Sequence, residues 1–354
     1  MRKRIKRMTV IILLAAIVLP AGTSAASGEW LAFSGEPAPE EIISPVQEYT
    51  GTVRITFLGD CTLGGEEKTR NAGRGFNRTV ERNGFEYPFR GLAELTASDD
   101  LTVANLEGVL SDRDLPKVEK TYNFKGATAY TEILKAGSVE CVTLANNHSH
   151  DYDTAGYLDT KAALDAAGVA YFGTDCTAVW RNEEGLMIGF LGVSGSLSGN
   201  RARAYEKKAA FLRSAGCAAV ITVMHAGTEY ASEPDSYQKQ IVKRAAECGS
   251  DLVIGHHPHV VQGIDFIENI PVIYSLGNLC FGGTINLSGY DAMIVRASIF
   301  FESGKPETKT ELIPIKTSSR YSENINDFRP IPAEDIEKEI IRMKVQADTG
   351  FLLP

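Results

Sequence analysis

Histidine is scarce in this chain, and its few copies are grouped. Only six of the 354 residues are histidine. Each group lies at or just past the end of a hydrophobic run, and the members are His148, His150, His225, His256, His257 and His259. This pattern excludes histidines scattered through the core or surface. It indicates a metal site assembled from several strand ends, although a His-rich surface loop would also explain the group at 256–259 taken alone.

Positive charge is also scarce. Lysine and arginine number 36 against 45 aspartates and glutamates, so the formal net charge is −9. Loss of the N-terminal segment described below would remove five basic residues and no acidic one, which would leave −14. An acidic surface of this kind disfavours nucleic acid and anionic membranes as partners.

Cysteine is neither frequent nor clustered. The six copies are widely spaced and mostly lie in or beside apolar runs: Cys61, Cys141, Cys176, Cys217, Cys248 and Cys280. An even number permits disulfides outside the cytoplasm, but a chain this long can bury enough core without them. We expect mainly buried free thiols. The sequence also lacks internal repeats and low-complexity tracts, which favours one large domain.

The N-terminus has the pattern of a targeting segment. Five basic residues precede the apolar run Thr9–Ala21, and small residues follow at 23–26. Residues 1–26 are therefore expected to be a signal peptide cleaved after Ala25 or Ala26. The apolar run is short for a membrane span, but an uncleaved N-terminal anchor is the alternative. The protein is expected to be extracytoplasmic, either secreted or anchored.

The rest of the chain predicts an α/β fold. Prolines among acidic and small residues predict a linker at 27–50. Strands are expected at Val53–Leu58, Leu101–Ala104, Val139–Leu144, Leu186–Val193, Ala218–Met224, Leu252–Ile254 and Val272–Tyr274. Helices closed by glycine are expected at Thr154–Ala167, Arg201–Ala215 and Ser236–Cys248. This alternation predicts a sheet covered by helices.

The pattern changes after Tyr290. Two apolar-rich segments, Ala292–Phe301 and Thr308–Lys316, surround Gly304-Lys305-Pro306 and predict a β-hairpin without a helix. The expected domain covers residues 51–319, and residues 320–354 are expected to form a C-terminal tail.

Polar motifs follow the predicted strands at several points. Asp60 lies on a glycine turn, Glu107 follows the run at 101–104, and Asn146-Asn147-His148 follows the run at 139–144. Side chains just past strand ends are where α/β proteins place ligand and catalytic groups. Helix caps or Asx turns are the alternatives for any one motif. Gly255 is expected to turn the chain sharply before His256.

As an ordered series, these motifs resemble the calcineurin-like metallophosphoesterase superfamily and, most closely, its CapA branch of poly-γ-glutamate capsule synthesis proteins. The resemblance covers roughly residues 52–316 through GDCTLGG, NLEGVL, ANNHSHD, HAGTEY, GHHPHVVQG and YSLGN. It implies a four-layer α/β/β/α sandwich with a metal centre at one edge of the two sheets.

The resemblance also implies roles for individual residues. The implied metal ligands are Asp60, Glu107, Asn147, His225, His257 and His259, and the implied catalytic residue is His148. Neighbouring polar residues are expected to contact substrate, namely Asn105, Asn146, Asp151, Glu229, His256 and Asn278. Imidazole, carboxylate and amide ligands suit Zn²⁺, Mn²⁺ or Fe without choosing among them.

The chain departs from the superfamily pattern in two of its metal motifs. Thr62 stands where these phosphoesterases normally have the histidine of Asp-x-His, and Glu107 stands where they usually have aspartate. We therefore expect one strong and one weak metal position, with one or two ions bound.

Two functions remain open from the sequence. The first is an exported metal-dependent hydrolase or transferase in the synthesis, release or anchoring of poly-γ-glutamate or a related anionic envelope polymer. Its target is a phosphoester or a γ-glutamyl amide. The second is a non-catalytic, polymer-binding partner of a membrane polymerase complex. The non-ligating His148 favours the first, because a binding module has little need of it.

Overall fold

The computed structural model describes residues 28–34, 49–302 and 306–349. The expected signal or anchor segment, residues 1–26, lies outside these residues. None of the helices in the described ranges combines the length and apolar character that a membrane span needs. All six cysteines are free thiols and all but Cys248 are buried, which confirms the prediction for them.

The first sheet has seven strands. In spatial order they are β1 (Gly28–Ser34), β8 (Cys176–Asn182), β9 (Met187–Ser194), β10 (Ala219–His225), β11 (Leu252–His256), β13 (Ile270–Ile273) and β12 (Ile264–Ile267). The central strands β9, β10, β11 and β13 are parallel to one another. Antiparallel strands lie at both edges.

The second sheet has eight strands. Seven of them follow the order β17 (Ile331–Pro332), β16 (Glu307–Lys316), β15 (Asp291–Phe301), β2 (Gly51–Thr62), β3 (Leu101–Leu106), β6 (Cys141–Thr143) and β7 (Ala170–Phe172), and β14 (Asn278–Phe281) pairs with β2. Strands β2, β3, β6 and β7 are parallel, whereas β15 runs antiparallel to both β2 and β16. Strands β4 (Val109–Leu110) and β5 (Lys125–Gly126) form a small separate pair.

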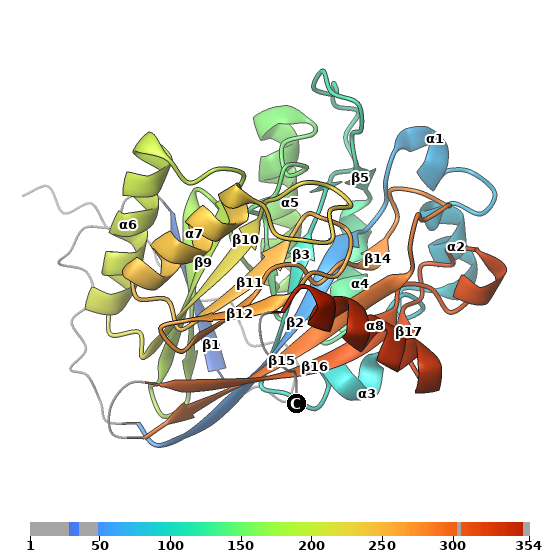
Figure 1. Cartoon of the computed structure of the whole chain (residues 1–354). Coiled ribbons are helices and arrows are strands. Elements are labelled where there is room, and N and C mark those ends of the chain that lie inside the picture. The colour runs from blue at the N-terminus through green and yellow to red at the C-terminus, as the bar shows by residue number, and fades with distance from the viewer. Residues whose placement is uncertain (1–27, 35–48, 303–305, 350–354) are drawn as a thin grey trace, which may run out of the picture.

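Helices cover the outer face of each sheet. Helices α6 (Gly199–Ser214) and α7 (Ser236–Glu247) pack on the first sheet. Helices α2 (Phe76–Asn83), α4 (Thr131–Ala136) and α5 (Asp153–Ala167) pack on the second sheet (Figure 1). The short helices α1 (Glu67–Arg70) and α3 (Ala93–Thr96) complete that side.

The inner faces of the two sheets share one buried core. Ile55 and Phe57 of β2 belong to the same apolar cluster as Phe190 of β9 and Ile221 of β10. Every residue of β3, β10 and β11 is buried. Because these strands are covered on both faces, their sequences read as continuous apolar runs rather than as an alternating pattern. Burial of each large apolar side chain contributes about 1.5–3 kcal/mol.

The structure confirms the mixed α/β class. Each apolar run that predicted a strand contains one, and the three predicted helices are α5, α6 and α7. Helix α7 begins with a capping box, in which Asp235 accepts from the N–H of Gln238 and the Gln238 side chain accepts from the N–H of Asp235. Helix α5 ends at Gly168, whose φ is 71°.

Two segments differ from the prediction. The expected linker at 27–50 begins instead with strand β1, which pairs with β8 and brings Trp30 against Trp180. The linker interpretation depended on prolines that come after this strand. The expected tail at 320–354 contains β17 and helix α8 (Asp335–Ala347). Ile341 and Val345 of α8 belong to the core between the sheets.

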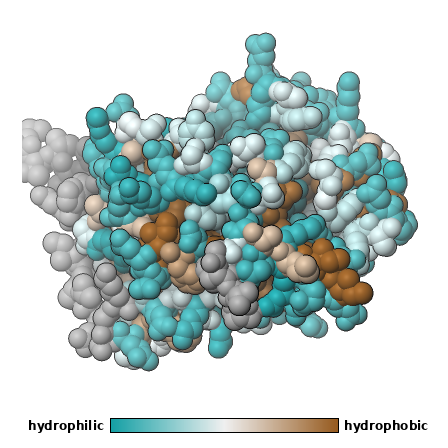
Figure 2. Space-filling view, in the orientation of Figure 1, coloured by the Kyte–Doolittle hydropathy of each residue, from teal (hydrophilic) through white to brown (hydrophobic). Residues whose placement is uncertain are grey.

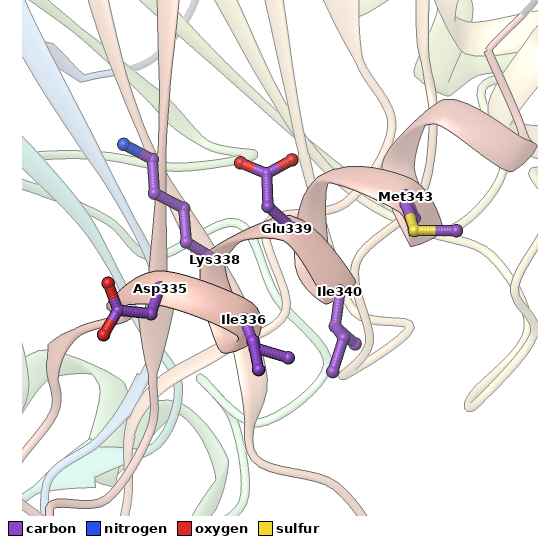
Figure 3. A pocket seen from close by; sticks show the side chains of 6 residues that line it. All are labelled: Asp335, Ile336, Lys338, Glu339, Ile340 and Met343. Carbon is purple, nitrogen blue, oxygen red and sulfur yellow. The ribbon is translucent and has the colours of Figure 1, made fainter.

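The outward face of α8 is apolar and open. Ile336 is 75% exposed, Met343 is 69% exposed, and Ile340 lies between them. Figure 2 shows brown, hydrophobic atoms over this helix on a face that is otherwise mostly hydrophilic. Figure 3 shows the same side chains beside Asp335, Lys338 and Glu339, which with them line a shallow depression. This face lies on a different element from every predicted site residue.

Candidate metal centre

Polar residues at the ends of strands from both sheets lie close together. Asp60 near the end of β2 is in register with Asn105 of β3 and with Asn278 of β14. His225 at the end of β10 is in register with His256 at the end of β11. The parallel pairing therefore gathers residues that are far apart in the sequence at one edge of each sheet.

Two glycines allow strands to approach closely beside the site. A Cβ on Gly59 would lie 2.3 Å from the carbonyl oxygen of Gly277, and one on Gly255 would lie 2.0 Å from that of Tyr274. Gly255 is thus a strand residue, and the prediction that it turns the chain was wrong. The turn comes at His257 and His259, whose φ angles are 99° and 59°. Non-glycine residues rarely adopt such angles, and strain of this kind clusters at functional sites.

Asp60, Glu107 and His259 form what we call the inner group. Their ligand atoms lie within 4.8 Å of one another. Glu107 is wholly buried, and neither of its carboxylate oxygens has a hydrogen-bond partner among the described residues. Burying an unpaired carboxylate costs several kcal/mol, so a fold that keeps one leaves a place for a cation.

Three imidazoles surround the carboxylate of Glu107. Its Oε1 lies 3.8 Å from Nε2 of His148, 3.7 Å from Nε2 of His225 and 4.0 Å from Nε2 of His259. These separations are too long for hydrogen bonds. Ligands with bonds of about 2.0–2.2 Å to one ion lie roughly 3–4 Å apart, so the spacing fits an ion held by Glu107 with His225 and His259, and His148 lies beside it without ligating.

Burial and charge set the pKa values of the inner group. Burial, with the Asp60 charge adding to it, raises the pKa of Glu107 to about 8. Burial alone would lower the pKa of His259, but the negative charges of Glu107 and Asp60 raise it to about 9. Burial would raise the pKa of Asp60, but hydrogen bonds from His256 and His259 hold it well below its usual range. Without a metal the group therefore pairs a charged Asp60 with a cationic His259 and a protonated Glu107, and a bound cation would favour the deprotonated, ligating forms of Glu107 and His259.

Asn147, His225 and His257 form a second group beside the first. Nε2 of His225 lies 2.8 Å from Oδ1 of Asn147 and 3.1 Å from Nδ1 of His257. Burial lowers the pKa of both His225 and His257, which favours the neutral imidazoles that bind metals. The structure therefore brings all six predicted ligands into two adjoining groups.

His148 lies next to these ligands and is held by Asp151. Its Nδ1 lies 2.7 Å from Oδ2 of Asp151, so Nε2 faces Glu107. Burial lowers the pKa of His148, with the hydrogen bond to Asp151 opposing this effect. A neutral imidazole with one nitrogen fixed by a carboxylate can accept or donate a proton at the other.

Two residues that sequence reasoning missed hold the His148–Asp151 pair. Lys120 places Nζ 2.5 Å from Oδ1 of Asp151 and donates to the carbonyl oxygen of Asn147 at 2.9 Å. Phe124 donates its N–H to Oδ2 of Asp151 at 2.6 Å and stacks its ring on His148, with centroids 4.1 Å apart. Both come from the segment between β4 and β5. Nothing in the sequence around Tyr122-Asn123-Phe124 indicates a contact with His148, so this role could not be predicted from the sequence.

Most of the residues that we predicted to contact substrate are buried and bond the predicted metal ligands or their neighbours. Asn105 is buried and donates through Nδ2 to Oδ1 of Asp60 at 2.7 Å, and Asn146 donates to Oδ1 of Asn105 at 3.0 Å. Nδ1 of His256 is also buried, 3.1 Å from Oδ1 of Asp60. These side chains orient Asp60, and their contact with substrate stays a prediction.

Of the remaining three predicted substrate contacts, two are buried against histidines of the site and one is exposed. Asn278 is buried with Oδ1 2.9 Å from Nδ1 of His259, and Asp151 is buried against His148. Glu229 alone among the six is exposed. His150 departs from the other histidines, because it is exposed and stacks on Tyr157 with ring centroids 4.4 Å apart.

Comparison with known proteins agrees on one family. Residues 54–283 match the family described as "Bacterial capsule synthesis protein PGA_cap", which belongs to the metallophosphoesterase-like superfamily. The chain is 27% identical over 267 residues to "Capsule biosynthesis protein CapA" of Bacillus anthracis, which covers 68% of this chain and 63% of that protein. It is 25% identical over 258 residues to "PGA biosynthesis protein CapA" of Bacillus subtilis (strain 168), covering 67% and 65%. The match thus spans just under two thirds of the length of these relatives.

Proposed function

This chain belongs to the family of bacterial capsule synthesis proteins, and on that premise we propose that it is an exported, metal-dependent hydrolase or transferase. It acts in the synthesis, release or anchoring of poly-γ-glutamate or a related anionic envelope polymer. Its two sheets and their outer helices form a four-layer α/β/β/α sandwich of the metallophosphoesterase type, with β15 and β16 as a C-terminal hairpin. The names of the two CapA relatives support the polymer.

One observation carries the proposal of a metal-dependent enzyme. Glu107 is fully buried with both carboxylate oxygens unpaired among the described residues, and three imidazoles surround it at 3.7–4.0 Å. Such an arrangement costs free energy unless a cation occupies it. The donor set suits Zn²⁺, Mn²⁺ or Fe, as one or two ions. Such an ion supplies an activated water and polarises the oxygen of a phosphoryl or acyl group.

The chain's own residues then perform the proton transfer. Asp151 holds Nδ1 of His148, so Nε2 is the nitrogen that gives a proton to the leaving group or stabilises its charge. Lys120 and Phe124 keep this pair in place. Asn105, Asn146, His256 and Asn278 fix the ligands, so bound substrate meets a preorganised site.

Export is a second part of the proposal. The basic and apolar pattern of residues 1–26 supports it. Cell fractionation should find the chain outside the cytosol, secreted or membrane-held. Recovery of the full-length chain in the cytosol would contradict export and the envelope role with it.

A turnover assay tests the enzyme directly. Metal-loaded protein is offered a generic phosphodiester and, separately, a γ-glutamyl polymer. His148→Ala should retain its metal and lower turnover by about 10²–10⁴-fold, the usual contribution of a positioned acid or base. Asn147→Ala should instead weaken metal binding, since Oδ1 of Asn147 belongs to the second ligand group.

One combination of results would contradict the proposed catalytic function. If metal-loaded wild type cleaves neither substrate and His148→Ala supports normal polymer production in cells, catalysis fails as an explanation. The chain would then be a non-catalytic, polymer-binding partner of a membrane polymerase complex. Thr62, which brings no imidazole to the site, is the feature that favours this second function.

A further inference from the structure

We propose that Glu229 is a metal ligand, and that with His257 and His259 it binds an ion at the mouth of the site. This inference rests on the proposed metal centre and extends it outward. The ligand atoms of these three side chains lie within 4.8 Å of one another. Glu229 is exposed and the two histidines are half-buried, so this mouth group opens to solvent.

The loop that carries Glu229 is fixed over the histidine turn. The N–H of the next residue, Tyr230, donates to the carbonyl oxygen of Pro258 at 2.8 Å. Gln262, which is wholly buried, donates through Nε2 to the carbonyl oxygens of Ala231 at 2.9 Å and Glu233 at 3.1 Å. These bonds tie the loop after β10 to the loop after β11 on both sides of the turn. The position of Glu229 opposite the two imidazoles is therefore built into the fold.

Nothing else in the described chain uses the Glu229 carboxylate. Among residues 28–34, 49–302 and 306–349 it has no hydrogen bond and no ion pair. His257 and His259 meanwhile hold positive φ angles, which only the surrounding structure can maintain. A free carboxylate facing two constrained imidazoles is a mixed oxygen and nitrogen donor set of the kind that transition metals take.

A direct contact between Glu229 and the polymer fits the charges less well. Poly-γ-glutamate and similar envelope polymers are polyanions, and an exposed carboxylate at the entrance would repel them. A cation held by Glu229 would neutralise that charge and present a positive centre to the polymer. The predicted role of Glu229 as a substrate contact is thus replaced by a role through the ion.

The shared histidine predicts unequal affinities. His259 belongs to both the inner group and the mouth group, so ions at the two places compete for it. The inner group has two buried carboxylates, whereas the mouth group has one exposed carboxylate. The mouth ion should therefore be the weaker of two.

Calorimetric titration of Mn²⁺ into chelator-treated full-length protein tests this. Wild type should bind in two steps. Glu229→Gln keeps the size of the side chain and removes the charge, and it should weaken the second step by at least about tenfold while leaving the first unchanged. Glu233→Gln is the matched control, because Glu233 is an exposed glutamate on the same loop. It should titrate as wild type does.

The results separate this inference from the metal centre itself. Two unchanged steps in Glu229→Gln, or equal weakening in Glu233→Gln, would overturn the role of Glu229 and leave the inner group standing. A single step in wild type that Glu229→Gln does not alter would also overturn it. Wild type that binds no Mn²⁺ at all would remove the metal centre and this ligand with it. Unchanged thermal midpoints in both variants would establish that neither substitution disturbs the fold.

Discussion

Individual side chains at the site fall into candidate metal ligands and the residues that orient them. Sequence reasoning identified the carboxylates and imidazoles correctly as neighbours, because each directly follows an apolar run and this relation is local. It did not predict that Asn105, Asn146 and His256 orient Asp60, because a contact behind a predicted ligand is a property of the folded chain. Lys120 escaped notice for the same reason, since its partner Asp151 is 31 residues away.

Among the individual side chains that position His148, Phe124 is the most informative one to change. Phe124→Leu removes the ring that stacks on His148 and keeps the backbone N–H that binds Asp151. We expect turnover to fall by roughly tenfold or more, since small displacements of a catalytic group can cost up to about 10²-fold. Metal affinity should not change, because Phe124 stacks on His148 and binds Asp151, and neither of these is a predicted metal ligand. NMR of the His148 ring should report the loss of a single orientation.

Tyr122→Leu serves as the control for that change. Tyr122 is exposed, and its ring stacks on Phe124 with centroids 6.5 Å apart and not on His148, so its loss should affect turnover far less. Equal turnover in Phe124→Leu and wild type would show that the ring does not position His148.

Secondary-structure elements were predictable where burial on both faces gave them continuous apolar runs. Strands β3, β10 and β11 are of this kind. Strand β1 was not predicted, because it is a short edge strand and the prolines that follow it dominate the composition of 27–50. Helix α8 was not predicted because only part of one face is buried, so its apolar residues look unremarkable among charged neighbours.

The packing of helix α8 on the core between the sheets can be tested by two substitutions. Ile341 is fully buried in the core between the sheets, and Ile336 on the same helix is 75% exposed. Ile341→Ala should lower the free energy of unfolding by about 2–5 kcal/mol, from lost burial and the cavity left behind. Ile336→Ala should change it by no more than about 0.5 kcal/mol. Denaturant unfolding measures both, and equal effects would contradict the packing of α8.

The described residues form two sheets on a common core (Figure 1). The candidate metal site lies at an edge formed by strands of both sheets. Mixed α/β class and family followed from the sequence, whereas the pairing that brings Asp60, His225 and His256 together did not. Strand order is a long-range property, and a single sequence carries no direct record of which runs are neighbours. The resemblance supplied that information, and residue spacing alone would not have done so.

The central claim is that the edge shared by the two sheets holds a metal ion through Glu107. The most direct measurement is the affinity of the full-length chain for Zn²⁺ and Mn²⁺ at neutral pH, with Glu107→Gln beside wild type. Because burial raises the pKa of Glu107 to about 8, the uncharged amide resembles the metal-free side chain and should preserve the fold. Asp99→Asn is the control, since Asp99 is a partly buried carboxyl group away from the site, and burial raises its pKa to about 6.

We expect wild type and Asp99→Asn to bind metal alike, and Glu107→Gln to bind it at least about 10²-fold more weakly with an unchanged or higher thermal midpoint in the absence of metal. Wild type that takes up neither metal, or Glu107→Gln that binds as tightly as wild type, would contradict the account.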